Sequence, residues 1–271
     1  MKNHIGNTFR LYNMKKKLLI SLGCSFTQGT GIYKPIDNVM DIKPDTEDFN
    51  KLENQSIEYM LTLGWPSQLQ EMLGYDYLIN FGKGGSSNGE SIRRLFDVIY
   101  KDDLSKFDVT IVLLSTFIHR IGFYKNYQPT TFQWDTDVMN AYIRDISRDE
   151  DWILDTIFYI KTLSEFCNNR NYKLVCGLLE GEPRDFYARE LKDTNVYLIK
   201  TPIQHKFEGE FKSIVEWDPH PNENGYKIMA RIFANEMKEF MGQATTYHKI
   251  TYNDYKISKR TFFNNESNPL P

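Results

Sequence analysis

The chain has 271 residues, of which 41% are hydrophobic and 14% aromatic, a composition that excludes a disordered or collagen-like protein. Its formal net charge is −3, with lysine and arginine spread along the sequence, so it lacks the basic field that binding to a nucleic acid backbone requires. We therefore expect a globular protein whose main partner is not a nucleic acid.

The cysteines and the longest apolar runs bear on the compartment. Three cysteines, an odd number, argue against a disulfide framework and favour a reducing compartment. No stretch approaches the ~20 apolar residues of a membrane span. The apolar run that ends at Leu22 is too short for a signal peptide and is interpreted as a strand. The sequence thus predicts a cytoplasmic protein without membrane contact.

Taken in chain order, short apolar segments alternate with amphipathic ones. Buried strands are predicted at 16–22, 75–81, 109–115, 172–179 and, more weakly, 195–201. Helices are predicted at 64–74, 88–104, 149–170 and 222–241. This alternation is typical of an α/β fold with a doubly wound parallel sheet, here of about five strands.

Regions outside this alternation define the expected domain organisation. Residues 1–15 form an N-terminal extension, and 16–241 form the main domain. Within it, 32–62 is polar, acidic and proline-containing, which favours a long loop or lid. In 242–271, tyrosine, isoleucine and phenylalanine alternate with polar residues. We expect an extended arm that packs on this chain or on a neighbour, as in a homo-oligomer or a virus particle.

Ser25 lies in "GCSFTQG", directly after the first predicted strand. Serine in such a turn commonly bonds nearby backbone groups. The alternative is a nucleophile, because ligands of open parallel sheets bind beyond the carboxyl ends of the strands. The surrounding residues do not match the G-x-S-x-G elbow of α/β-hydrolases.

His220 lies late in the chain, in "EWDPHPNENGY". A serine nucleophile needs a base, and the imidazole needs an acceptor on its other nitrogen. Asp218 is near enough in sequence to be that acceptor. Taken alone, Asp-Pro-His is more often a turn before a helix. The triad Ser25–His220–Asp218 is therefore a hypothesis that needs further support.

That support comes from a family resemblance. The stretch "GCSFTQG" resembles the first block of the SGNH, or GDSL-like, hydrolase superfamily, with Ser25 as nucleophile. "NFGKGGSSN" resembles the second block, in which Asn80 starts an N-x-G-x-x-G pattern and Gly85 matches the oxyanion-hole glycine. "DPHPNENGY" resembles the fifth block, and the order and spacing agree over 16–241. The stretches "GWPSQLQEMLG", before the second block, and "SSNGESIRR", after it, look like the versions of this family that occur in phage-type sequences.

The resemblance implies a flavodoxin-like three-layer α/β/α sandwich and a serine esterase or deacetylase without a cofactor. Its substrate would be an acyl ester, often an acetyl ester, on a small molecule, glycan or lipid. Ser25 would attack the carbonyl, His220 would act as base and then acid, and Asp218 would orient His220. The backbone N–H groups of Ser25 and Gly85 would face the developing oxyanion.

The chain departs from the family in its third block. The family pattern there is Gly-x-Asn-Asp, whose asparagine completes the oxyanion hole, whereas this chain has "VTIVLLSTFIHR". Ser115 or Thr116 could donate a hydroxyl, Asn88 could reach in from the second block, or the third donor is missing. Asn88 is the donor we include in the expected site.

A second departure concerns the carboxylate. Many family members place aspartate three residues before the histidine, where this chain has Trp217. Asp218 lies two residues before His220, and Glu216 lies four before it. Asp218 is favoured because the short spacing resembles the phage-type variants, while Glu216 remains the alternative.

Other candidate residues have simpler interpretations. His119 and Arg120 bind an anionic group of the substrate or form an ordinary loop pair with the acidic 32–62 segment. No ligand spacing connects His4, His205 and His248, so no metal site is expected. Cys24 adjoins Ser25 but is expected to point the opposite way, into the core.

Two other functions compete with the esterase. The missing third-block asparagine and the aromatic arm are compatible with a binding or assembly protein, such as one of a virion, that keeps this fold after its catalysis has decayed. A nucleotide-binding domain that uses "GKGGSSNG" to cradle phosphate is weaker, because the stretch lacks the ending of a P-loop.

Overall fold

The computed structural model describes residues 15–34, 43, 46–99, 103–115, 122–125, 128–131, 149–204, 207, 209–213, 215 and 218–241. The predicted strands are found as β1 (Lys16–Leu22), β2 (Tyr77–Asn80), β3 (Phe107–Leu114), β6 (Lys173–Gly177) and β7 (Val196–Leu198). The predicted helices are found as α3 (Trp65–Leu73), α4 (Asn88–Ile99), α6 (Asp149–Arg170) and α8 (Glu223–Phe240). Elements that the sequence did not predict are α1 (Ser25–Gln28), α2 (Glu47–Leu63), β4 (Gly122–Lys125), β5 (Gln128–Thr131), α7 (Arg184–Glu190) and the 3-10 helix η2 (Gly209–Phe211).

The main sheet has five strands in the order β2-β1-β3-β6-β7, and every neighbouring pair is parallel. This is the flavodoxin-like order, in which the chain winds first to one side of β1 and then to the other. Strands β4 and β5 pair with each other as a separate antiparallel hairpin. The expected α/β fold with a five-stranded parallel sheet is confirmed.

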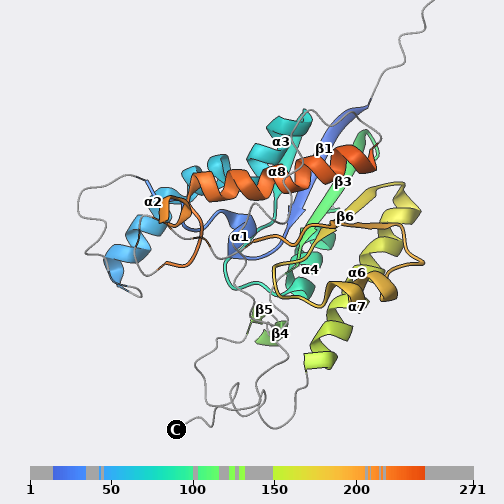
Figure 1. The fold of residues 1–271 in the computed structure, drawn as a ribbon. Coiled ribbons are helices and arrows are strands. Elements are labelled where there is room, and N and C mark those ends of the chain that lie inside the picture. The colour runs from blue at the N-terminus through green and yellow to red at the C-terminus, as the bar shows by residue number, and fades with distance from the viewer. Residues whose placement is uncertain are drawn as a thin grey trace, which may run out of the picture.

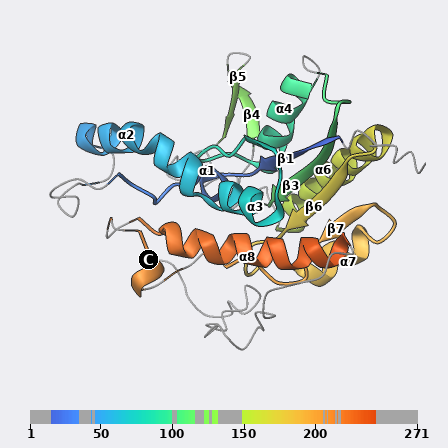
Figure 2. The ribbon, with the colours of Figure 1, turned by 90° about the horizontal axis from the view of Figure 1, so that it is seen from above.

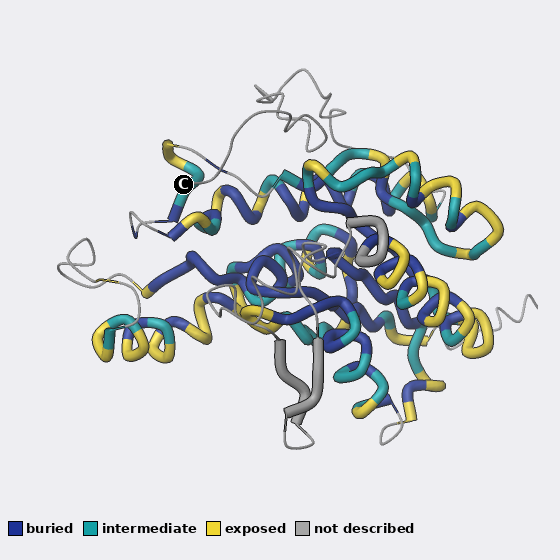
Figure 3. Tube along the Cα trace, turned by 90° about the horizontal axis from the view of Figure 1, so that it is seen from below, coloured by how far each residue is buried: buried dark blue, intermediate teal, exposed yellow. Residues whose placement is uncertain are grey.

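Helices cover both faces of the sheet and make the three layers (Figure 1, Figure 2). Because side chains alternate along a strand, β1 sends Leu19 to one face and its neighbours Leu18 and Ile20 to the other. Leu19 lies in the core formed with α3 and α8, and Leu18 and Ile20 lie in the core formed with α4 and α6. Figure 3 shows the strands and the inward helix faces as the buried part of the molecule.

Helix α2 corrects the expectation of a long loop or lid over 32–62. The Thr46 Oγ1 caps it by accepting a hydrogen bond from the Phe49 N–H. Leu52 and Met60 are buried, but the buried stripe also contains the polar Ser56. Because a serine occupies one of the buried positions, apolar residues do not recur regularly at helical spacing in this stretch. The capping residue Thr46 is the main indication of a helix in the sequence. Helix α2 packs against α3.

Several predictions concern segments outside the described residues. These are the 242–271 arm, most of the 1–15 extension, and Thr116, His119, Arg120, His4, His205, His248 and Glu216. Within the described part of the chain, no helix is long and apolar enough to cross a membrane.

Candidate active site

The serine turn forms because β1 ends just before a four-residue helix. Ser25 is the first residue of α1, and the Cys24 carbonyl accepts hydrogen bonds from the N–H groups of Thr27 and Gln28. The Ser25 side chain is therefore at the carboxyl end of β1, and its own N–H lies at a helix start, where intrahelical partners are lacking. Cys24 is fully buried, so its predicted orientation into the core is confirmed.

His220 lies beside Ser25, although a long stretch of chain separates them. Its Nε2 is 2.7 Å from the Ser25 Oγ, and its Nδ1 is 2.5 Å from the Asp218 Oδ1. The turn that carries His220 leads into α8, whose first turn is capped by the Asn222 side chain. The Phe26 ring lies against the imidazole, with ring centroids 4.8 Å apart. With a proton on Nδ1, Nε2 is free to accept the serine hydroxyl proton.

The carboxylate of Asp218 is buried and has several hydrogen-bond donors. Besides the imidazole, the His220 N–H donates to Oδ1 at 3.0 Å, and the Tyr33 hydroxyl donates to Oδ2 at 2.6 Å. Burial by itself raises the pKa of Asp218, but the contacts from His220 and Tyr33 outweigh it and hold that pKa below its ordinary value. Asp218 is thus an ionised acceptor next to the imidazole.

Gly31 explains how the histidine turn approaches the serine segment. It has a φ of 102°, in the left-handed region. A Cβ built on it would lie 2.6 Å from the Pro221 carbonyl oxygen and 2.7 Å from the His220 Cβ. A glycine at this position therefore permits His220 to lie where its ring reaches Ser25.

Asn80, the first residue of the second-block pattern, connects three segments. Its Oδ1 accepts hydrogen bonds from the Ser21 hydroxyl at 3.0 Å and from the Gly82 N–H at 2.8 Å. Its Nδ2 donates to the Thr27 carbonyl at 2.9 Å. The role of this asparagine is structural: it joins β1, α1 and the loop that follows β2.

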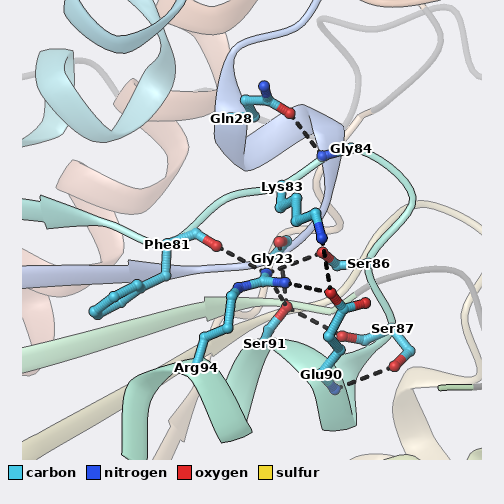
Figure 4. A network of polar contacts seen from close by, with 10 residues as sticks. All are labelled: Gly23, Gln28, Phe81, Lys83, Gly84, Ser86, Ser87, Glu90, Ser91 and Arg94. Carbon is cyan, nitrogen blue, oxygen red and sulfur yellow. Dashed lines mark hydrogen bonds and ion pairs between the residues drawn. The ribbon is translucent and has the colours of Figure 1, made fainter. Parts of the chain in front are cut away.

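The loop of residues 81–87, which we call the glycine loop, lies against the serine turn. The Gln28 Oε1 of α1 accepts a hydrogen bond of 2.6 Å from the Gly84 N–H (Figure 4). The next residue, Gly85, is exposed and has a φ of 73°, and a Cβ built on it would meet nothing within 4 Å. Space is therefore open around Gly85, the expected oxyanion-hole residue.

Arg94 of α4 supports the glycine loop from below (Figure 4). Its guanidinium donates to the Phe81 carbonyl and the Ser86 Oγ, both at 2.9 Å, and to the Glu90 carboxylate at 2.7 Å. The Glu90 side chain is almost fully buried. Ser91, which also accepts from Arg94, donates to the Gly23 carbonyl at 3.2 Å. Arg94 thus links both ends of the glycine loop, and Ser91 connects it to Gly23, which precedes the serine turn.

Asn88 and Ser115 belong to a second polar cluster. The Asn88 Nδ2 donates to the Thr156 Oγ1 at 3.2 Å and to the Ser115 Oγ at 3.4 Å. Ser115, at the end of β3, lies 3.1 Å from both carboxylate oxygens of Glu182. Burial raises the pKa of Glu182 to about 8, despite hydrogen bonds that lower it. The Asn88 amide is thus directed toward Ser115 and Thr156.

Three features of this site were not predicted from the sequence: Tyr33, the Arg94–Glu90 pair and Glu182. The Arg94–Glu90 pair had a local signal, because opposite charges four positions apart lie on one helix face. Tyr33 and Glu182 lie in segments without a motif. No group of three or more histidine, cysteine, aspartate or glutamate side chains that could hold a metal is found among the described residues.

No family model matches the chain, and no curated protein matches it. Solved structures do resemble the fold. The psychrotrophic esterase EstA from Pseudoalteromonas sp. is 15% identical over 84% of this chain and 100% of its own, with a TM-score of 0.46. A carbohydrate acetylesterase family member from Sinorhizobium meliloti is 12% identical over 83% of this chain and 99% of its own, with a TM-score of 0.44.

A family two carbohydrate esterase from Cellvibrio japonicus is 13% identical over 84% of this chain and 62% of its own, with a TM-score of 0.48. At these identities and TM-scores the similarity does not establish an activity for this chain.

Proposed function

We propose that this chain is a serine ester hydrolase of the SGNH type that removes an acyl group, most simply acetyl, from an ester on a carbohydrate or related small molecule. The observation that carries the proposal is the continuous hydrogen-bonded chain Ser25 Oγ, His220 and Asp218 at the carboxyl end of β1. A nucleophile, its base and the group that orients the base are the parts that acyl transfer requires.

In the proposed reaction, the Ser25 Oγ attacks the ester carbonyl carbon while His220 Nε2 takes the hydroxyl proton. The tetrahedral intermediate collapses when its bond to the alcohol oxygen breaks, and His220 returns the proton to that leaving oxygen. Water, deprotonated by His220, then attacks the acyl carbon. The bond from that carbon to the Ser25 Oγ breaks, His220 returns the proton to this oxygen, and the acid is released. Asp218 stabilises the imidazolium in both halves of the reaction.

The proposed oxyanion donors are the backbone N–H groups of Ser25 and Gly85, with Asn88 as the third. The open space around Gly85 and the attachment of its loop to α1 support the first pair. For Asn88, the 3.4 Å contact to Ser115 is the weaker of its two hydrogen bonds, and the amide would have to give it up to face a substrate.

The test is covalent labelling with a fluorophosphonate probe, followed by a panel of acetylated sugars and short acyl esters. We expect the wild type to be labelled and Ser25→Ala to be unlabelled and inactive. Ser105→Ala is the matched control, because Ser105 is exposed and lies just before β3, at the amino end of the parallel strands and away from Ser25. An unlabelled and inactive wild type would instead favour the binding or assembly protein that has lost catalysis.

A further inference from the structure

Tyr33 lies between the serine turn and α2. Its hydroxyl donates a 2.6 Å hydrogen bond to the Asp218 Oδ2, the oxygen that does not face the imidazole. Tyr33 is 4% exposed and Asp218 is 2% exposed, so the contact is shielded from water. A hydrogen bond between a buried hydroxyl and a buried carboxylate is charge-assisted and strong.

Helix α2 holds Tyr33 in this position. The Tyr33 ring packs with Leu52, Met60 and Val215 in a small buried cluster, and the Phe49 ring lies edge-on to it at 6.1 Å. The backbone is fixed as well, because the N–H of the next residue, Lys34, donates to the Ser56 Oγ at 2.9 Å. The segment expected to be a lid thus packs against Tyr33, the residue that binds the Asp218 carboxylate.

The charged and titratable groups around the pair come from several elements. Tyr33 faces Asp218 from the loop before α2, and Tyr226 faces it from α8, with its own hydroxyl bonded to the Thr30 carbonyl. Glu53 of α2 acts on Tyr33 through its charge. Burial and the Asp218 charge raise the pKa of Tyr33, so the phenol stays protonated and remains a donor.

We propose that Tyr33 is a positioning residue that fixes the Asp218 carboxylate and shares its negative charge, and thereby sets how strongly His220 holds a proton. This inference rests on the proposed function for its catalytic consequence, but not for its electrostatic one. A carboxylate that gives part of its charge to a hydroxyl attracts the imidazolium proton less. With Tyr33 present, His220 is therefore neutral, and able to act as a base, at a lower pH.

The experiment is a titration of the His220 ring by NMR in the wild type and in Tyr33→Phe, which keeps the ring and removes the hydroxyl. The His220 signal is assigned with a His220→Gln variant. We expect the pKa of His220 to rise by about half a unit or more in Tyr33→Phe. If the protein is active, the acidic limb of kcat/KM should move up by the same amount. The matched control is Tyr75→Phe, a buried tyrosine just before β2, at the amino end of the parallel strands.

An unchanged or lowered pKa of His220 in folded Tyr33→Phe would overturn the inference and make Tyr33 a packing residue only. If Tyr33→Phe does not fold, Ser56→Ala serves instead, because it loosens the segment but keeps the hydroxyl. The shift should then have the same direction and be smaller, and no shift would again overturn the inference. Because the NMR titration needs no turnover, its result is separate from a failure of the proposed function, which labelling and the ester panel would reveal.

Discussion

The Nε2 of His220 lies 2.7 Å from the Oγ of Ser25, although 195 positions separate the two residues in the chain. The parallel sheet brings them together, because Ser25 follows β1 directly and His220 precedes the helix that covers one face of that strand.

We expect Ser25→Ala and His220→Ala each to lower kcat for ester hydrolysis by roughly 10⁴-fold or more, with little further loss in the double variant. The two side chains act on the same proton, so removing either one disables both. Steady-state kinetics on the best ester of the panel measures this. If the loss of kcat in the double variant equals the product of the two single losses, the residues act independently.

Asp218→Asn is expected to keep the fold and to lower kcat by about 10³- to 10⁴-fold, since the amide cannot stabilise the charged ring or fix its tautomer. Activity should be lost as the pH falls far enough to protonate the imidazole, because the neutral ring is the base. The matched variant is Glu216→Gln, for which we expect a small effect. The reverse order of effects would mean that Glu216 is the carboxylate.

For the oxyanion hole, we expect Gly85→Val to lower kcat strongly, because a β-branched residue strains a backbone with a φ of 73° and displaces the N–H. If Asn88 is the third donor, Asn88→Ala should lower kcat by about 10²-fold. Ser115→Ala, which removes a partner of Asn88 inside the second polar cluster, should cost less. Equal and small effects of both alanine variants would leave the backbone donors alone.

Arg94→Met should lower the free energy of unfolding by about 2 kcal/mol, because it removes the nearer cation of the buried Glu90 carboxylate and leaves only the Lys83 ammonium, at 3.4 Å. It should also lower kcat more than it raises KM, since the glycine loop loses the bonds at its two ends. Chemical denaturation and kinetics measure both. Lys173→Met, which breaks the exposed pair with Asp108, is the control and should cost less than about 1 kcal/mol.

Glu182 is expected to make the protein less stable as the pH rises. Its pKa is about 8 in the folded chain and near the ordinary 4.5 when unfolded, so between these values the folded state holds the extra proton. The free energy of unfolding therefore falls with rising pH across this window and levels off above it. Glu182→Gln should remove this slope, so the Tm of the variant relative to that of the wild type should increase from pH 5 to pH 8. If Tm changes by the same amount between pH 5 and pH 8 in the wild type and in Glu182→Gln, the prediction is wrong.

Much of the fold could be predicted, because its signals are local. Each strand of the main sheet is a short apolar run, and the run over 16–22 matches β1 residue for residue. Helix α2 was missed because Ser56 occupies a buried position that a period-based argument expects to be apolar. The alternation of strands and helices predicts a parallel sheet of about five strands, but it does not give the order of the strands, and the separate hairpin of β4 and β5 has no such signal.

The site was predictable only in part, for the same reason. Ser25 and the Asp-Pro-His triplet stand in recognisable motifs, so their roles could be proposed before their geometry was known. The contact between Tyr33 and Asp218 spans 185 positions, and no local pattern in a tyrosine indicates a buried carboxylate partner. Arg94 and Glu90 had the spacing of an exposed helix pair, and only the fold shows that they lie beneath a loop.

The tight approach at Gly31 has a practical consequence for finding distant relatives. Gly31 and Tyr33 follow Ser25 by six and eight positions, and they contact the turn that carries Asp218 and His220. Any side chain at position 31 would push that turn away, so serine and Asp-Pro-His alone do not define the arrangement. A search pattern that joins G-x-Y, at this distance from the serine, to a later D-P-H would select chains able to build the same hydrogen-bonded chain of serine, histidine, aspartate and tyrosine.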